Sequence, residues 1–119
     1  MSPIRNKIIP HEEVREAKGQ SVVLCHGHFN IIHPGHVRYL EFARQQGEKL
    51  MVSIQGDNSL IKEGRKEFFP EEERAAGVAS LHLVDQVVLL HDSSLKDLIE
   101  VLIPDLLVLG KEFEYETHE

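Results

Sequence analysis

Short apolar runs alternate with amphipathic segments along most of this chain. The runs are continuous, as in strands that are buried on both faces, and they are SVVLC (21–25), LMVSI (50–54), QVVLL (86–90) and LLVLG (106–110). Between them, apolar residues recur every three or four positions, which predicts helices. Strands that alternate with helices predict parallel βαβ units, and therefore an α/β fold with helices on both faces of the sheet.

Three helices follow from this spacing. The first begins at Pro34, and its expected inward-facing residues are Val37, Tyr39, Leu40, Phe42 and Ala43. The second begins near Pro70, where three glutamates complement the positive end of the helix dipole. The third is capped by Ser93 or Ser94 and stopped by Pro104.

Two polar segments give weaker predictions. Residues 11–18 predict a short leading helix, and residues 55–68 predict a loop or a short irregular helix. The length of 119 residues suits a single domain spanning residues 1–119, whose core we expect over residues 20–113.

Composition and charge restrict the class of protein. The chain is 41% hydrophobic, yet it has no apolar run near the ~20 residues of a membrane span, so we expect no membrane partner. Its first residues are too polar for a signal peptide, and one cysteine, Cys25, fits a cytoplasmic protein and a core position. Residues 82–119 hold nine acidic and two basic residues, which argues against a nucleic-acid partner.

A histidine-rich stretch, CHGHFNIIHPGH (25–36), lies where the first long strand should turn into a helix. Gly27 permits a tight bend, and Gly35 leaves room for a phosphate beside the free N–H groups of the helix start. His33 and His36 share a face there, so their N–H groups form a site for polyphosphate. The order of the elements brings Lys62 and Arg74 toward the same sheet edge, beyond the carboxyl ends of the strands.

Other readings of the histidines stay open. His26 and His28 alternate on extended backbone and could share one face, so a histidine-rich metal-binding protein is an alternative. No second cluster of Cys, Asp or Glu completes a familiar ligand pattern, and we assign no metal ligand. Four histidines are expected to be helix caps or solvated residues, namely His11, His82, His91 and His118.

The stretch GHFNIIHPGH resembles the first signature, G-x-F-D-x-x-H-x-G-H, of the HxGH nucleotidyltransferase superfamily. The segments HPGHVRYLEFARQQGEKLMVSI, FFPEEERAAGVASLHLVDQVVLL and LIPDLLVLGKEF resemble its cytidylyltransferase-like branch, so the similarity covers about residues 7–113. That branch includes glycerol-3-phosphate cytidylyltransferase and the adenylyltransferase half of the bifunctional heptose-phosphate enzyme. The resemblance implies a Rossmann-like, doubly wound parallel sheet of the nucleotidyltransferase type, in three α/β/α layers.

The resemblance also implies a reaction, in which AMP or CMP passes from ATP or CTP to a phosphorylated sugar or polyol and pyrophosphate is released. Mg²⁺ is the implied cofactor. His33 and His36 would stabilise the transition state at the α-phosphorus, Lys62 would reach the phosphates, and Arg74 would hold the acceptor phosphate or the pyrophosphate. The implied nucleotide-binding residues are Gly27, His28, Phe29, Asn30, Gly35 and Asp57.

The cations have simpler alternatives. Lys62, with Arg65 or Lys66 as helpers, could belong to a solvated charged loop. Arg74 could pair with Glu71 or with a neighbouring carboxylate.

The sequence departs from the family pattern in three places. Asn30 replaces the usual Asp, His28 replaces a residue that is commonly Cys or Thr, and no Ser/Thr-rich second signature follows Gly110. We therefore expect either a piece of a longer chain or a short divergent member. The alternative function is a non-catalytic nucleotide-binding or dimerisation module. Because strand 106–110 could lie at an open sheet edge, we expect a homodimer.

Overall fold

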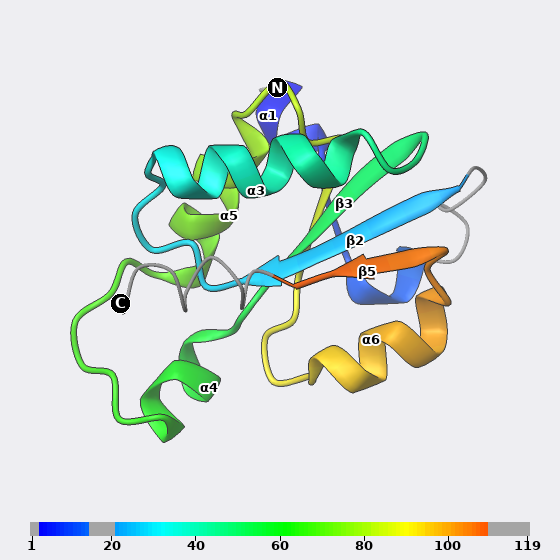
Figure 1. Ribbon diagram of the computed structural model, residues 1–119. Helices are drawn as coiled ribbons and strands as arrows, with labels where there is room; N and C mark the ends of the chain where they lie inside the picture. Colours follow the sequence, from blue (N-terminus) through cyan, green and yellow to red (C-terminus); the bar gives the residue numbers. More distant parts are fainter. Residues whose placement is uncertain (1–2, 15–20, 110–119) are drawn as a thin grey trace.

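The computed structural model describes residues 3–14 and 21–109, which form a five-stranded, all-parallel sheet (Figure 1). The strand order is β1-β4-β3-β2-β5. The strands are β1 (Ile8–Ile9), β2 (Val22–Gly27), β3 (Lys49–Ile54), β4 (Gln86–Leu89) and β5 (Leu106–Val108). The four predicted strands and their parallel arrangement are confirmed, whereas the two-residue β1 was not predicted.

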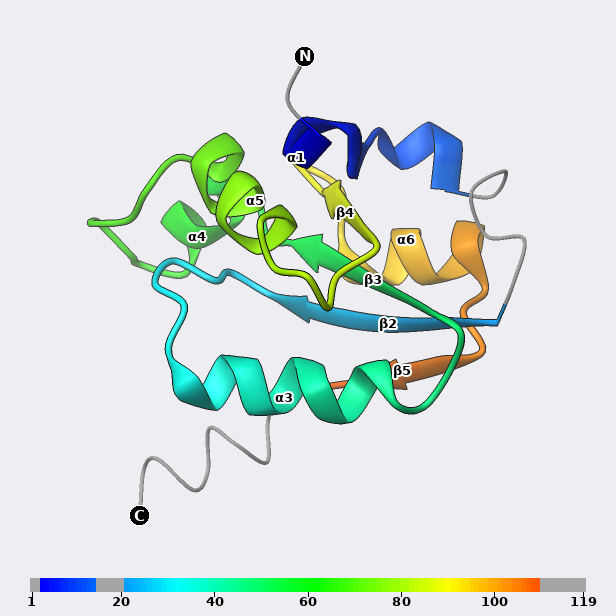
Figure 2. The ribbon, with the colours of Figure 1, turned by 90° about the horizontal axis from the view of Figure 1, so that it is seen from above.

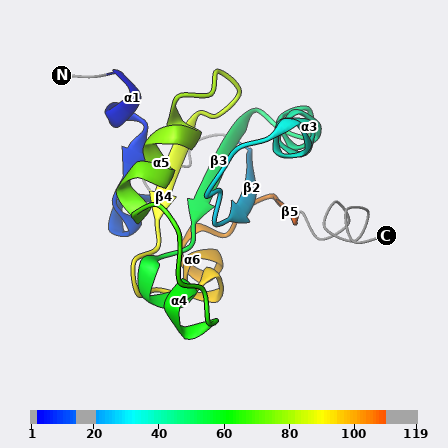
Figure 3. The ribbon, with the colours of Figure 1, turned by 90° about the vertical axis from the view of Figure 1, so that its left-hand side faces the viewer.

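Helices cover both faces of this sheet. They are α1 (Pro3–Asn6), α3 (Pro34–Arg44), α4 (Asp57–Lys62), α5 (Glu71–Ala79) and α6 (Leu95–Leu102), with a 3-10 turn η1 (His11–Glu13). Figure 3 shows α3 and α5 on one side of the strands and α4 and α6 on the other. The predicted three-layer Rossmann-like fold is therefore confirmed. Within the described residues, none of these helices is long and apolar enough to cross a bilayer.

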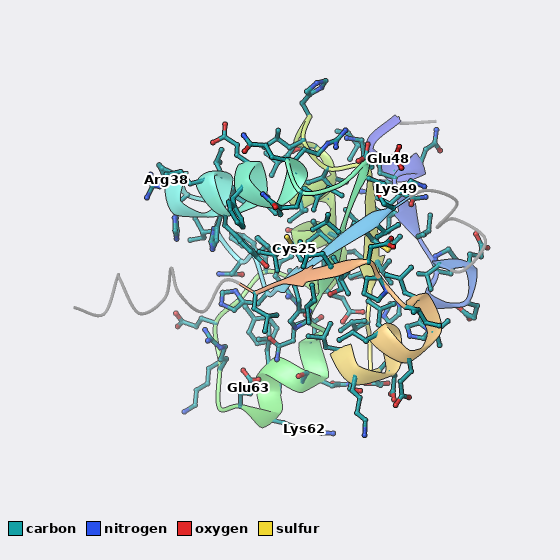
Figure 4. All side chains as sticks on the ribbon, turned by 45° about the vertical axis from the view of Figure 1, so that its right-hand side comes forward. Cys25, Arg38, Glu48, Lys49, Lys62 and Glu63 are labelled. Atoms are coloured by element: carbon teal, nitrogen blue, oxygen red, sulfur yellow. The ribbon has the colours of Figure 1, made fainter. Side chains whose placement is uncertain are left out.

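The core lies on both faces of the sheet because successive strand residues point to opposite sides. In β2, Val23 and Cys25 pack toward α3 and α5, whereas Val22 and Leu24 pack toward α6. Both faces are buried, which explains why the strands are continuous apolar runs rather than alternating ones. The predicted core position of Cys25 is confirmed, and Figure 4 shows this residue at the centre of the molecule.

Two helix predictions need correction. The leading helix predicted over residues 11–18 begins as the short 3-10 turn η1, and its residues 15–18 lie outside the described residues. Phe42 does not widen the apolar stripe of α3, because its side chain is 52% exposed. The buried residues Tyr39, Leu40 and Ala43 define the inward face, and Phe42 lies roughly 100° around the helix from its centre.

The other helix signals are confirmed. Ser94 caps α6, accepting a hydrogen bond from the Asp97 N–H, and the helix ends two residues before Pro104. Pro70 is the N-cap of α5, and the three glutamates that follow it form the first helical turn. The segment 55–68 contains the short helix α4, in agreement with one of the two alternatives for it.

Candidate functional site

The segments that carry the candidate residues meet at the carboxyl ends of the strands. In Figure 2 the arrowheads of β2 and β3 point to the edge where the β2–α3 turn, α4 and the loop after α4 all lie. The first turn of α5 reaches the same edge, because Arg74 bonds to the carbonyl of His28 in the β2–α3 turn and to that of Gln55 between β3 and α4. The sequence prediction that these segments gather at one edge is confirmed.

His33 and His36 cap the start of α3 reciprocally. His33 is the N-cap, and its Nδ1 accepts a hydrogen bond of 3.0 Å from the Gly35 N–H. His36 Nδ1 accepts one of 3.2 Å from the His33 N–H, and the two rings stack with their centroids 3.9 Å apart. A neutral imidazole that accepts through Nδ1 carries its proton on Nε2. The caps therefore select the tautomer in which Nε2–H of each ring is the donor.

His36 is held in its neutral form by its surroundings. Burial lowers the pKa of His36 below its ordinary value of 6.5, and the nearby His33 and His28 lower it further, against an opposing interaction with the Ile31 backbone. Protonation at Nδ1 would also remove the acceptor that the cap needs. His36 accordingly presents an imidazole N–H group to the turn rather than an imidazolium ion.

Phe29 and two glycines pack closely in the β2–α3 turn. Phe29 is 3% exposed, has a positive φ of 48°, and its ring centroid lies 5.2 Å from that of His36. A β-carbon at Gly27 would lie 2.9 Å from Cε2 of Phe29, and one at Gly35 would lie 2.8 Å from Cε1 of His33. A side chain at either position would therefore displace a ring that packs against the backbone.

Arg74 is buried and bonded to the protein. Its Nε donates to the Phe69 carbonyl at 2.8 Å, and its Nη1 donates to the carbonyls of His28 at 3.0 Å and Gln55 at 2.7 Å. Its Nη2 lies 2.6 Å from Oδ1 of Asp57, so protein acceptors take four of its five N–H donors. This differs from the expected phosphate-binding cation. The alternative was a pair with Glu71 or a neighbouring carboxylate; Arg74 does pair with a carboxylate, but it is that of Asp57 rather than Glu71.

Glu71 extends this network to the end of β4. Its Oε1 accepts the Asp57 N–H at 2.8 Å, and its Oε2 forms a short contact with His91 Nδ1. The His91 side chain is 61% exposed, in agreement with the prediction of a solvated histidine, but the prediction missed its contact with Glu71. The resulting polar chain links the carboxyl ends of β2, β3 and β4.

Asn30 links the β2–α3 turn to the loop that precedes α5, and His28 bonds to the backbone of Asn30. Asn30 Oδ1 accepts a 2.6 Å hydrogen bond from the Phe69 N–H, and His28 Nδ1 accepts one of 3.2 Å from the Asn30 N–H. Since Arg74 bonds to the Phe69 carbonyl, both backbone groups of Phe69 are engaged. Two of the predicted nucleotide-binding residues thus have a described structural role at this edge.

The three loop cations lie outside this network. Lys62 ends α4 and its side chain extends into solvent (Figure 4). Arg65 lies 3.7 Å from Glu63, and Lys66 is exposed. None of the contacts in the described part of the chain joins these cations to the histidine turn.

Arg38 is a cation at the turn that the sequence analysis missed. A β-carbon at Gly35 would lie 3.8 Å from its Nη2, so the guanidinium folds back over the start of α3. The available signal was its position three residues after Gly35, because helical side chains lie over the preceding turn.

A metal centre was the remaining alternative for the histidines. Among residues 3–14 and 21–109, no group of three or more His, Cys, Asp or Glu could hold a metal ion.

Comparison with known proteins gives one family. The profile of the family described as Cytidylyltransferase-like matches residues 24–119. The Bifunctional protein HldE of Pasteurella multocida is 38% identical over 85% of this chain and 22% of its own length. That of Citrifermentans bemidjiense is 37% identical over 97% of this chain and 24% of its own length. The chain therefore spans about a quarter of the length of these curated relatives.

A solved structure shares the fold. The lipopolysaccharide core biosynthesis protein from Thermoplasma volcanium GSS1 superposes with a TM-score of 0.70 at 29% identity. The match covers 75% of this chain and 73% of that chain.

Proposed function

This chain belongs to the cytidylyltransferase-like family, and we propose that it is a nucleotidyltransferase that transfers AMP or CMP from ATP or CTP to a phosphorylated sugar or polyol. The observation that carries the proposal is the reciprocal cap of His33 and His36, which places two imidazoles at the positive end of α3 with their protons on Nε2. Such a pair of neutral donors beside a helix N-terminus suits a phosphate chain.

The proposed reaction is a single in-line displacement. An oxygen of the acceptor's phosphate forms a bond to the α-phosphorus, and the bond from that phosphorus to the bridging oxygen breaks. The electron pair leaves with pyrophosphate. Little covalent chemistry is required of the protein, so the Nε2–H groups of His33 and His36 contribute by aligning the phosphates and stabilising negative charge on the α-phosphoryl oxygens.

Arg74 has a positioning role in this proposal. Its hydrogen bonds to the carbonyls of His28 and Gln55 join the first residues after β2 and after β3. This linkage fixes the two sides of the site relative to each other before substrate arrives. We therefore propose that Arg74 acts through the loops rather than through a phosphate.

Magnesium is expected with the nucleoside triphosphate, but a protein-held magnesium site does not fit these residues. Asp57 is engaged by Arg74, and Glu71 is engaged by the Asp57 N–H and by His91. These carboxylates are the ligands that Mg²⁺ would prefer. No step of the reaction is therefore assigned to a metal on the protein.

The test is pyrophosphate release from ATP or CTP with a panel of sugar phosphates. His36→Gln keeps a side-chain acceptor at the third helical position, as in a capping box, but removes the imidazole. We expect this variant to lose release by about 100-fold with its circular dichroism spectrum unchanged. His82→Gln, at an exposed position, is the control and should match the wild type.

The outcomes separate enzyme from binding module. Release that survives His36→Gln would overturn the proposed role of the histidine pair. Binding of ATP or CTP without release from any acceptor would favour the non-catalytic nucleotide-binding module.

We also propose a homodimer that forms at the edge strand β5. Leu106 is 41% exposed and Leu109 is 39% exposed, so this edge carries apolar side chains. Sedimentation should show a dimer that Leu106→Glu weakens, and a wild-type monomer at high concentration would contradict the proposal.

A further inference from the structure

The guanidinium of Arg38 and the imidazole of His33 both approach the β-carbon position of Gly35. The position of a β-carbon on that glycine would be 2.8 Å from His33 Cε1, 3.1 Å from His33 Nδ1 and 3.8 Å from Arg38 Nη2. Figure 4 shows Arg38 at the N-terminal end of α3. A glycine therefore leaves room for both side chains over the first turn of the helix.

Arg38 differs from the other arginines of this region because it has no ion pair or hydrogen bond within residues 3–14 and 21–109. In the same helix, Arg44 lies 3.7 Å from Asp85 and donates to the Gly47 carbonyl. Arg74 is bonded to four protein acceptors. Arg38 is exposed, so its donors are free to bind an anion from solvent.

We propose that Arg38 binds the β- and γ-phosphates of the nucleoside triphosphate and holds the departing pyrophosphate. This inference rests on the proposed function and adds a residue to it. A planar guanidinium binds two phosphate oxygens at once, and it stays charged at any pH at which the protein is folded.

The burial of the three side chains suggests which phosphates each one contacts, with Arg38 at the β- and γ-phosphates. His36 is half-buried against Phe29, whereas His33 is exposed, and Arg38, exposed as well, folds its guanidinium back over Gly35. The reacting α-phosphate belongs at the inner end, beside the two imidazoles. The chain of phosphates then runs outward toward the guanidinium.

This placement has a chemical consequence. When the bond between the α-phosphorus and the bridging oxygen breaks, its electron pair stays on the β-phosphate, and pyrophosphate gains negative charge. Arg38 neutralises that charge without giving up a proton. The hydrogen bonds that His33 and His36 accept at Nδ1 leave each ring only an Nε2–H group to offer, so the guanidinium is the group at this turn that brings a full positive charge to the leaving group.

The experiment titrates inorganic tripolyphosphate into the full chain by calorimetry. We expect Arg38→Ala to weaken binding at least about tenfold, because the charge-assisted bonds of the guanidinium to the phosphate oxygens are lost, and Arg38→Lys to restore part of the affinity. The variant should fold, because alanine is favourable at an exposed helical position. Lys96→Ala, on the exposed side of α6, removes the same net charge and should leave the affinity unchanged.

Turnover gives the second measurement. Inhibition by added pyrophosphate should weaken about tenfold in Arg38→Ala, with no such change in Lys96→Ala. Equal tripolyphosphate affinity in wild type and Arg38→Ala, or an equal loss in Lys96→Ala, would overturn the inference, as would a wild type that does not bind tripolyphosphate. If Arg38-dependent binding is present but ATP and CTP are never cleaved, the proposed function fails and the assignment of Arg38 stands.

Discussion

The Arg74 guanidinium lies 2.6 Å from the Asp57 carboxylate, and this ion pair joins the first turn of α5 to the first turn of α4. The Arg74 side chain has no exposed surface, whereas that of Asp57 is 34% exposed. The pair is therefore protected from water on one side only. Its importance comes from the three carbonyl groups that share the same guanidinium.

Replacement of Arg74 by leucine should destabilise the fold strongly. The variant leaves three carbonyls and a carboxylate without their donor, and the expected loss is about 3 kcal/mol in the free energy of unfolding. Urea denaturation measures it. Arg44→Leu is the matched control, because its pair with Asp85 is over one-third exposed on both sides and should contribute less than about 1 kcal/mol. Equal losses in the two variants would contradict the structural role of Arg74.

Replacement by alanine should change the free energy of unfolding in opposite directions at two glycines. A β-carbon at Gly56 would lie 1.9 Å from the His91 carbonyl oxygen, so Gly56→Ala must displace backbone and should cost about 2 kcal/mol or more. At Gly77, inside α5, the nearest atom would be 3.7 Å away, and alanine should stabilise the helix by about 0.5–1 kcal/mol. Thermal unfolding measures both changes in stability. A Gly56→Ala protein as stable as the wild type would show that the backbone of Gly56 is not in close contact with the His91 carbonyl.

The structural and chemical roles of His33 can be separated. Asparagine is a favoured N-cap residue and accepts from the same backbone N–H groups, so His33→Asn should keep the free energy of unfolding within about 0.5 kcal/mol. It should nevertheless lower pyrophosphate release by about 100-fold, because the imidazole donor is gone. His33→Leu, which cannot cap, should lose stability as well, by about 1 kcal/mol. Full activity in His33→Asn would leave the imidazole with no part in the chemistry.

Acidification should destabilise the protein through His26 and His36. Burial is the largest cause that lowers the pKa of both residues, and neighbouring histidines lower it further, although Glu63 and the bond to Ser53 oppose the shift at His26. When the pH falls below the ordinary histidine pKa of 6.5, these two histidines bind more protons in the unfolded chain than in the folded chain. The free energy of unfolding should therefore fall as the pH drops from about 7.5 to about 5.5.

A variant identifies the source of this pH dependence. His26→Gln should flatten the fall in unfolding free energy between the two pH values, whereas His82→Gln should leave it unchanged. An identical pH dependence in wild type and His26→Gln would show that the proton uptake occurs elsewhere.

Cys25 should be inert in the folded protein. Burial raises the pKa of its thiol to about 12, against a smaller opposing contribution from a hydrogen bond with Tyr39. Because the thiolate is the reactive form, a disulfide reagent should modify Cys25 at about pH 8 only after unfolding in denaturant. Rapid modification of the native protein would place the thiol at the surface.

The sequence predicted the elements whose signal is local. The four longer strands are continuous apolar runs, and α6 has both a cap at Ser94 and a stop at Pro104, so each could be located from its own residues. β1 could not, because the two residues Ile8 and Ile9 give no periodicity and are strand-like only when paired with β4.

The candidate site was predicted in position but not in its contacts. The spacing of His33 and His36 was enough to place them on one face of a helix start. The partners of Arg74 were not predictable, since Asp57 and the His28 carbonyl lie 17 and 46 residues away in the chain. Arg74 has the sequence context of an exposed helical cation, and only the tertiary fold shows that it is buried.

Three of the four bonds that Arg74 makes at the rim of this site end on carbonyl oxygens, at His28, Gln55 and Phe69. Every residue type supplies a carbonyl, so these three bonds do not depend on which side chains those positions carry. Evolution or a protein engineer can therefore vary those side chains while the bonds from Arg74 to the backbone keep this edge in shape.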